Sequence, residues 1–279
     1  MTQESGRIWV MGGRPLNGTA AVPAAKNSVL PVLAACCLCT SPCVLHNCPD
    51  IEDVRTALAI LESLGCKTRR EGSTLCIDAS GLSKFCVEKR LAGKMRSSIL
   101  FLGALLARCG KAELALPGGC PLGERPIDLH VKSLAKLGAR FRFEKGILQA
   151  AWRERRDGDI FLSIPSVGAT ENLLCAAVLG DGTFVLRNCA TEPEVTALAK
   201  LLVAMGAKIG GVGRSSLTVT GVAELHGATM HIIPDRIVAA TYIAAVCACG
   251  GKLLLTHYPS EYMTAFETAA CKNAGIKRF

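Results

Sequence analysis

The sequence predicts an α/β protein built from repeated units in which short strands alternate with apolar helices. One phrase, an apolar residue and a glycine followed by Cys, Ala or Ile and then by Lys or Arg, recurs four times. The repeated glycines are 73, 68 and 69 residues apart, and such regular spacing indicates repeated structural units. Because 50% of the 279 residues are hydrophobic and only 20% are charged, the chain has enough apolar side chains to bury a core. The four glycines are Gly65, Gly138, Gly206 and Gly275.

Each repeated glycine is expected to end a helix. Apolar residues precede the first glycine at helical spacing, at Val54, Leu58, Leu61 and Leu64. Glycine is the usual residue just past a helix C-terminus, because it adopts the left-handed backbone conformation without strain. Turn-like segments and short apolar stretches follow three of these glycines, which predicts hairpin strands. The second strands of these hairpins are expected at residues 74–77, 146–150 and 216–219.

Another apolar helix and a strand are predicted upstream of each glycine, so that the whole unit is βαβαββ. Examples are helices at 97–107 and 171–179, and strands at 112–116 and 183–186. A fourth unit shows a helix, a strand and a second helix, at 237–249, 252–256 and 261–274. Since units of this size need neighbours to cover their apolar faces, three units should form a complete domain. We expect that domain at 26–233 and an incomplete second domain at 1–25 and 234–279.

The composition narrows the class of protein and the kind of partner. Most of the fifteen cysteines fall in apolar runs, so most are expected to be small buried hydrophobes rather than a disulfide scaffold or a metal site. The longest apolar run, 29–39, is shorter than the ~20 residues of a membrane-spanning helix. A soluble protein of the reducing cytoplasm is expected, with no membrane partner. The net charge of +9 and the dispersed basic residues favour small anionic substrates over nucleic acid.

Five short motifs together resemble one enzyme family in order and spacing. They are Ala25–Ser28, Met95–Ile99, Leu116–Cys120, Gly123–His130 and Pro165–Asn172. The chain is similar to the enolpyruvyl transferases, and to their UDP-N-acetylglucosamine branch more than to their shikimate-pathway branch. The resemblance implies an inside-out α/β barrel of βαβαββ units, three per domain. It also implies transfer of the enolpyruvyl group of phosphoenolpyruvate to the 3-hydroxyl of UDP-N-acetylglucosamine, the first committed step of peptidoglycan synthesis, without a metal or another cofactor.

Cys120 differs from the other cysteines because loop-forming residues surround it. Pro117–Gly119 precede it and Pro121 follows it, which predicts an exposed thiol on a loop. A positive neighbour such as Arg125 would favour the thiolate, the reactive form of cysteine. The resemblance implies that Cys120 is the catalytic proton donor, the covalent partner of phosphoenolpyruvate and the fosfomycin target. A merely structural loop cysteine is the alternative.

The other predicted site residues are cations and segments near the starts of helices. Lys26 precedes the apolar run 29–39, where a helix N-terminus would add to its positive charge. Guanidinium groups suit two-point contact with phosphate and carboxylate oxygens. Ordinary surface Lys and Arg side chains are the alternative. The resemblance implies that phosphoenolpyruvate is bound by Lys26, Asn27 and Arg125, and that UDP-N-acetylglucosamine is bound by Arg96, Arg125, Pro126, Ile127, Asp128, Leu129, Ser166, Val167 and Gly168.

Two departures from the family pattern leave a second hypothesis open. Val238 stands where the family has an acidic residue. The family also continues past the fourth unit with a catalytic aspartate and with arginines that hold phosphoenolpyruvate, which this sequence lacks. The alternative is a truncated, catalytically impaired remnant that binds the sugar nucleotide. An incomplete second domain would also expose apolar surface through which the chain could associate.

Overall fold

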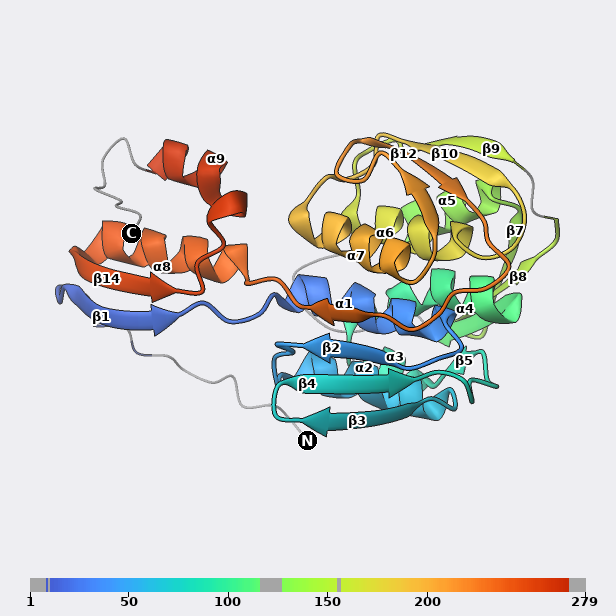
Figure 1. The fold of residues 1–279 in the computed structure, drawn as a ribbon, viewed down its shortest axis with the longest axis horizontal. Helices are drawn as coiled ribbons and strands as arrows, with labels where there is room; N and C mark the ends of the chain where they lie inside the picture. Colours follow the sequence, from blue (N-terminus) through green and yellow to red (C-terminus); the bar gives the residue numbers. More distant parts are fainter. Residues whose placement is uncertain (1–8, 10, 116–126, 155–156, 271–279) are drawn as a thin grey trace. The chain divides into compact units, whose positions relative to one another are not determined.

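The computed structural model describes residues 9, 11–115, 127–154 and 157–270. It divides into two compact units, a larger one of residues 24–233 and a smaller one of residues 1–23 and 234–279. In both units strands alternate with helices along the chain, as Figure 1 shows. The predicted α/β class of repeated units is therefore confirmed.

The larger unit contains three four-stranded sheets with the same strand order. In each sheet a hairpin pairs antiparallel with a preceding strand, and a fourth strand lies parallel to that strand at the edge. The three orders are β13-β2-β4-β3, β5-β6-β8-β7 and β9-β10-β12-β11. The strands are β2 (Cys43–His46), β3 (Lys67–Glu71), β4 (Thr74–Asp78), β5 (Cys86–Val87), β6 (Lys111–Ala115), β7 (Ala139–Glu144), β8 (Ile147–Trp152), β9 (Gly158–Phe161), β10 (Thr183–Arg187), β11 (Lys208–Gly210), β12 (Ser216–Thr220) and β13 (Thr229–His231).

The edge strands link the three sheets into a closed circuit. β5 follows β4 along the chain but pairs with β6 of the next sheet, and β9 likewise follows β8 and pairs with β10. β13 comes last and returns to the first sheet, where Thr229 lies opposite Val44 and His231 opposite His46. Each sheet is therefore completed by a strand from the unit before it, and the first sheet is completed by the third unit.

The helices of the larger unit fall into two groups. The helices directly before β2, β6 and β10 are buried along almost their whole length. The helices that follow these strands have one exposed face. A helix that is apolar all round belongs in a core. The buried group is α1 (Lys26–Ala35) with η1 (Cys36–Leu38), η2 (Arg96–Leu100) with α4 (Phe101–Cys109), and α6 (Val167–Ala177). The helices with one exposed face are α2 (Glu52–Ser63), α5 (Asp128–Lys136) and α7 (Pro193–Ala204), and the short helix α3 (Lys89–Ala92) lies between β5 and η2.

The predicted glycine caps are confirmed wherever the structure describes them. Gly65, Gly138 and Gly206 have φ angles of 103°, 105° and 105°, in the region that side chains disfavour. Each follows α2, α5 or α7, and its amide donates to a carbonyl three residues back, as Gly65 does to Glu62 at 3.0 Å. The predicted hairpin strands after them are β4, β8 and β12. Gly275 lies outside the described residues.

The smaller unit repeats part of the same pattern. It contains β1 (Leu16–Ala21), α8 (Arg236–Cys249), β14 (Gly251–Thr256) and α9 (Ser260–Ala270). β1 pairs parallel with β14, so it holds the place that β5 holds beside β6. The Asp235 side chain caps α8 by accepting hydrogen bonds from the amides of Ile237 and Val238, at 2.8 and 3.1 Å. The predicted helix, strand and helix of the fourth unit are confirmed within the described part of the chain.

The smaller unit has a much smaller core than the larger one. Among its described residues, the buried apolar side chains are Val22, Ala239 and Met263. Cys247 and Cys249 of α8 are exposed, although their apolar run predicted burial. The prediction of burial was wrong for these two cysteines because few other elements cover α8 in the described part of this unit. In the larger unit the expectation of buried cysteines holds for most positions, which are Cys36, Cys37, Cys39, Cys43, Cys48, Cys66, Cys175 and Cys189.

Two short segments carry the chain from one unit to the other, and they pair with each other. The Ala25 amide donates to the Ile233 carbonyl at 2.8 Å, and the Asp235 amide donates to the Pro23 carbonyl at 2.8 Å. The first of these bonds lies within the larger unit and the second within the smaller unit. None of the described helices is both long enough and apolar enough to cross a membrane.

Candidate functional site

The predicted site residues that the structure describes lie at the starts of helices. Lys26 and Asn27 begin α1, Arg96 begins η2, and Asp128 begins α5. Ser166 is the residue just before α6. The first amides of a helix have no partner within the helix and carry a partial positive charge, so they attract anions. The fold thus places these residues where phosphate and carboxylate groups are favoured.

Lys26 is oriented by an acidic residue that the sequence did not mark. Its ammonium group forms an ion pair with the Asp53 carboxylate in the first turn of α2. The Lys26 side chain is 50% exposed and that of Asp53 is 24% exposed, so the charge of the lysine still reaches solvent. Asn27 is also exposed. Asp53 escaped prediction because its partner lies 27 residues earlier and no motif joins them.

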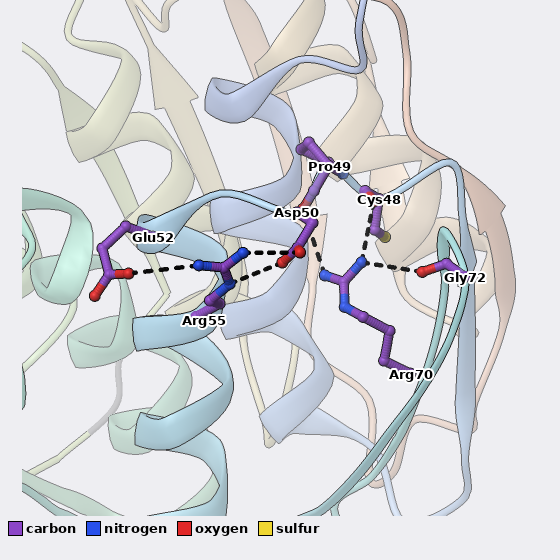
Figure 2. A network of polar contacts seen from close by, with 7 residues as sticks. All are labelled: Cys48, Pro49, Asp50, Glu52, Arg55, Arg70 and Gly72. Carbon is purple, nitrogen blue, oxygen red and sulfur yellow. Dashed lines mark hydrogen bonds and ion pairs between the residues drawn. The ribbon is translucent and has the colours of Figure 1, made fainter.

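A polar network fixes the segment that leads into α2 (Figure 2). Arg55 makes a two-point contact with the Asp50 carboxylate, at 2.9 and 2.8 Å, which lowers the pKa of Asp50. From β3, Arg70 crosses to the same segment and donates to backbone carbonyls there and in the β3–β4 turn. These contacts hold the approach to α2 and thereby the position of Asp53. The acceptors of Arg70 are the carbonyls of Cys48, Gly72 and Pro49, at 3.3, 3.3 and 3.4 Å.

His130 brings three of the predicted residues together. It lies in α5 and is only 7% exposed. Its ring packs against Gly168 of α6, where an added Cβ would lie 3.1 Å from Cε1 and 3.4 Å from Nε2. Arg96 and Asp128 are close enough to act on the pKa of the ring. Three motifs that are far apart in the sequence therefore meet around His130, which the sequence placed in a motif but gave no role.

Asn172 of α6 fixes the protonation state of His130. The Gly103 amide donates to Asn172 Oδ1 at 2.7 Å, and Asn172 Nδ2 donates to the Ile99 carbonyl at 3.0 Å. These partners settle which end of the side-chain amide is the donor. Nδ2 lies 2.7 Å from His130 Nδ1, so this ring nitrogen must accept a hydrogen bond. The ring proton is then on Nε2 and the imidazole is neutral.

Electrostatics agree with this assignment. Burial, with a further contribution from the Arg96 charge, lowers the pKa of His130 to about 4, and Asp128 opposes the shift. Asp128 itself is exposed and pairs with Lys132 at 2.9 Å, which lowers the pKa of its carboxyl. His130 is therefore an uncharged group with one Nε2–H donor beside a cationic arginine.

The start of α6 is held by its own side chains. Ser166 Oγ accepts from the Ala169 amide at 3.4 Å, and Thr170 Oγ1 donates to the Ser166 carbonyl at 2.8 Å. Thr170 Oγ1 also accepts from the Ala190 amide at 3.1 Å, which ties α6 to the segment before α7. The backbone from Ser166 to Gly168 is therefore fixed. The predicted residues Ile127, Leu129 and Val167 are partly buried and pack against the core.

Glu171 is a second buried titratable group in the same helix. It is 3% exposed, and its Oε1 has no hydrogen-bond partner among the described residues. Burial raises the pKa of its carboxyl well above the ordinary value, and Glu194 and Glu192 raise it further. The carboxyl is therefore neutral in the folded protein. The sequence treated this residue only as part of a helix start.

Three predicted residues, Cys120, Arg125 and Pro126, lie outside the described residues. The catalytic cysteine therefore stays a prediction. The described part of the site provides one lysine and one arginine, a neutral histidine and the starts of four helices.

The match to a family profile decides the relationship of the chain. The profile described as EPSP synthase (3-phosphoshikimate 1-carboxyvinyltransferase) matches residues 10–276. The chain belongs to this family. The match runs through both compact units and through all five motifs that predicted the resemblance.

Curated relatives confirm the more specific resemblance. The chain is 44% identical to the UDP-N-acetylglucosamine 1-carboxyvinyltransferase of Desulforapulum autotrophicum, over 92% of this chain and 62% of that protein. It is 45% identical to the protein of the same name from Nitratidesulfovibrio vulgaris, over 93% of this chain and 62% of that protein. The chain thus spans 62% of the length of these relatives.

Solved structures show the same fold. The enolpyruvyl transferase NikO from Streptomyces tendae superposes with a TM-score of 0.83 at 24% identity, over 95% of this chain and 64% of that one. The EPSP synthase of Acinetobacter baumannii gives a TM-score of 0.66 at 18% identity, over 85% of this chain and 54% of that one. The enolpyruvyl transferase fold predicted from the motifs is therefore confirmed.

Proposed function

We propose that this chain transfers the enolpyruvyl group of phosphoenolpyruvate to the 3-hydroxyl of UDP-N-acetylglucosamine, the first committed step of peptidoglycan synthesis, in the cytoplasm. The names of relatives that are 44% and 45% identical support this reaction. The observation that carries the proposal is the meeting of Arg96, Asp128 and Gly168 around the buried His130. This arrangement places the Arg96 cation near the start of α6, where Gly168 has no side chain to cover the backbone.

The sugar nucleotide would lie along the starts of α5 and α6. Backbone amides at Val167 and Gly168 have no acceptor within α6, and glycine allows a phosphate to approach the backbone closely. Arg96 would add a planar guanidinium that suits phosphate oxygens. Ile127–Leu129 would contact the nucleoside, as the family resemblance implies. A neutral His130 lets the Arg96 charge act on the ligand without a second cation that would have to be neutralised.

Phosphoenolpyruvate would bind near the start of α1. Lys26 and Asn27 are exposed there, and Asp53 holds the lysine in place. Arg125 would provide a second cation, and Cys120 would deliver the proton to C3 and form the covalent adduct that fosfomycin mimics. Cations fixed around a phosphate and a carboxylate stabilise charge that develops in the transition state, and a placed acid lowers the barrier to protonation.

A phosphate-release assay tests the reaction. Purified protein with both substrates should release inorganic phosphate, and release should stop when either substrate is left out. Cys120→Ala should abolish it, whereas Cys86→Ala should not, because Cys86 is an exposed cysteine on β5. Equal phosphate release by the Cys120→Ala variant would contradict the proposed role. Heat of binding with UDP-N-acetylglucosamine but no turnover would instead favour the alternative, a protein that binds the sugar nucleotide without catalysis.

Arg96 offers a test of the binding site that does not depend on turnover. Arg96→Lys keeps the charge but loses the two-point contact, so calorimetry should show UDP-N-acetylglucosamine binding weakened by about tenfold, equivalent to ~1.4 kcal/mol. Arg142→Lys is the matched control, since this exposed arginine on β7 pairs with Glu144 at 3.1 Å. Equal affinity in the two variants would remove Arg96 from the site.

A further inference from the structure

We propose that Cys39 and Cys43 form a site of covalent modification, an intramolecular disulfide that hydrogen peroxide closes in the folded protein. The two sulfur atoms lie 3.4 Å apart. A disulfide bond is about 2.0 Å long, so a shift of ~1.4 Å in the side chains would join them. The proposal is independent of the reaction proposed above.

The two cysteines lie at the two ends of one tight turn. Cys39 follows η1 and Cys43 begins β2. Both are fully buried, but Thr40 and Pro42 between them are exposed, so the turn that joins the two cysteines lies at the surface. A peroxide molecule is small enough to reach the thiols when the turn opens locally.

Neighbouring groups make Cys43 the attacking sulfur. Cys36 and Cys39 hydrogen-bond to it and lower its pKa, with smaller contributions from the Ala228 amide and the nearby His226. Cys39 has the opposite environment, because its contact with Cys43 and its burial raise its pKa. The thiolate is the nucleophilic form of cysteine. One sulfur of the pair is thus prepared to react and the other to resolve the product.

The reaction with peroxide balances within this pair. The Cys43 thiolate attacks one peroxide oxygen, the O–O bond breaks, and hydroxide is the leaving group. Cys43 is then a sulfenic acid. The Cys39 sulfur then attacks the Cys43 sulfur, the S–S bond forms, the S–O bond breaks, and the oxygen leaves as water. The two thiols lose two electrons to the peroxide, and their two protons end in two water molecules.

The turn that the disulfide would lock holds the segment that closes the larger unit. Ser41 Oγ accepts from the Gly227 amide at 2.7 Å, and the Thr40 amide donates to the Leu225 carbonyl at 3.3 Å. Residues 225–228 lead directly into β13, which pairs with β2. Oxidation would therefore stiffen the place where the circuit of sheets is joined.

Peptide mapping gives a direct readout. Trypsin releases residues 27–55 as one peptide, because no Lys or Arg lies inside it, and this peptide contains Cys36, Cys37, Cys39, Cys43 and Cys48. The folded full chain is treated with hydrogen peroxide, unfolded, alkylated with iodoacetamide and digested. The oxidised peptide should carry two fewer alkyl groups than the same peptide from untreated protein. Reduction with dithiothreitol before alkylation should restore both groups.

Single variants identify the pair. Cys43→Ser removes the attacking sulfur, so its peptide should keep every remaining cysteine alkylated after peroxide. Cys39→Ser removes the resolving sulfur, so its peptide should lose one alkyl group, at Cys43, and form no disulfide. Cys36→Ser and Cys48→Ser should still lose two alkyl groups. Circular dichroism checks that each variant is folded, and fragmentation of the wild-type peptide locates the bond if a variant is not. The proposal is overturned by full alkylation of the oxidised wild-type peptide, or by added oxygen in place of a disulfide in that peptide. It is also overturned by a disulfide that persists in Cys39→Ser, or by a cross-link to the peptide that contains Cys66, the neighbour of Cys37.

Discussion

A single hydrogen-bond network decides what His130 can do. Asn172 must donate to His130 because its other bonds, to Gly103 and Ile99, fix the orientation of its amide. A protonated His130 would turn its Nδ1–H toward the Asn172 N–H, so that two donors would face each other. Protonation therefore breaks a buried contact, in addition to the cost of burying the charge. The histidine of this site is a neutral donor rather than a cation.

This makes stability fall as the pH is lowered. His130 has a pKa of about 4 in the folded protein, against ~6.5 in the unfolded chain, so the unfolded state binds more protons between these values. His130→Gln should remove this dependence, so wild type should lose about 2 kcal/mol more than the variant between pH 7 and pH 4.5. Urea unfolding at both pH values measures the difference. His231→Gln, at an exposed position on β13, is the control, and parallel curves for wild type and His130→Gln would contradict the assignment.

Glu171 should have the opposite dependence. Its pKa is raised in the folded protein, so its contribution to stability is present at low pH and is lost as the pH rises above ~4.5. Glu171→Gln cannot ionise, and relative to wild type it should gain at least about 1 kcal/mol of unfolding free energy between pH 5 and pH 8. Urea titrations at these pH values test this, with Glu224→Gln as an exposed control. An equal response of both variants would show that Glu171 is ionised in the fold.

At the level of helices, the site depends on how closely α4 and α6 approach. A Cβ at Gly103 would lie 2.2 Å from the Asn172 carbonyl oxygen, and one at Gly168 would lie 3.1 Å from the His130 ring. The first neighbour is backbone inside a buried helix and cannot move aside, whereas the second is the end of a side chain. Gly103 therefore sets the spacing of the helices, and that spacing lets Asn172 reach His130.

Gly103→Ala should destabilise the protein even though Ala favours helices by up to about 1 kcal/mol. The added methyl forces α4 and α6 apart and disturbs the Asn172 bonds, so we expect a net loss of about 2–3 kcal/mol. Thermal or urea unfolding measures this loss. Gly210→Ala is a suitable control, because its new methyl would lie 3.8 Å from Thr218 and would fit without displacement. A Gly103→Ala variant as stable as wild type would show that the helices can separate freely.

The sequence predicted the parts of these elements that depend on local signals. Gly65, Gly138 and Gly206 have left-handed backbones where the chain leaves α2, α5 and α7, and the hairpins follow as predicted. Contacts between distant residues could not be read in the same way. The bond from Asn172 to Gly103 spans 69 residues, and the pairing of β13 with β2 spans about 185, with no residue type that marks either. The sequence motifs contain the residues that surround His130, but only the packing of the helices shows that these residues lie close together.

The two units of the molecule differ greatly in the size of the apolar core that stabilises each of them. The main core runs from Ala24 to Ile232 within the larger unit, whereas the described residues of the smaller unit include only three buried apolar side chains. In the part of the chain that the structure describes, every strand of these three sheets belongs to the larger unit. Cooperative folding needs a closed core rather than the whole chain. Residues 24–233 therefore contain what is needed to fold alone.

A fragment of residues 24–233 should accordingly unfold in one cooperative transition, with a midpoint close to the main transition of the full chain. A matched fragment of residues 24–223 lacks β13, so β2 would lose its parallel neighbour and the turn at Ser41 would lose its Gly227 partner. We expect this shorter fragment to unfold at a lower temperature and to bind more of a dye that reports exposed apolar surface. Circular dichroism melts and dye fluorescence compare the two. Equal stability of the fragments would mean that the circuit of sheets does not depend on its last strand, whereas failure of the longer fragment to fold would mean that the smaller unit supplies stability that its small core does not reveal.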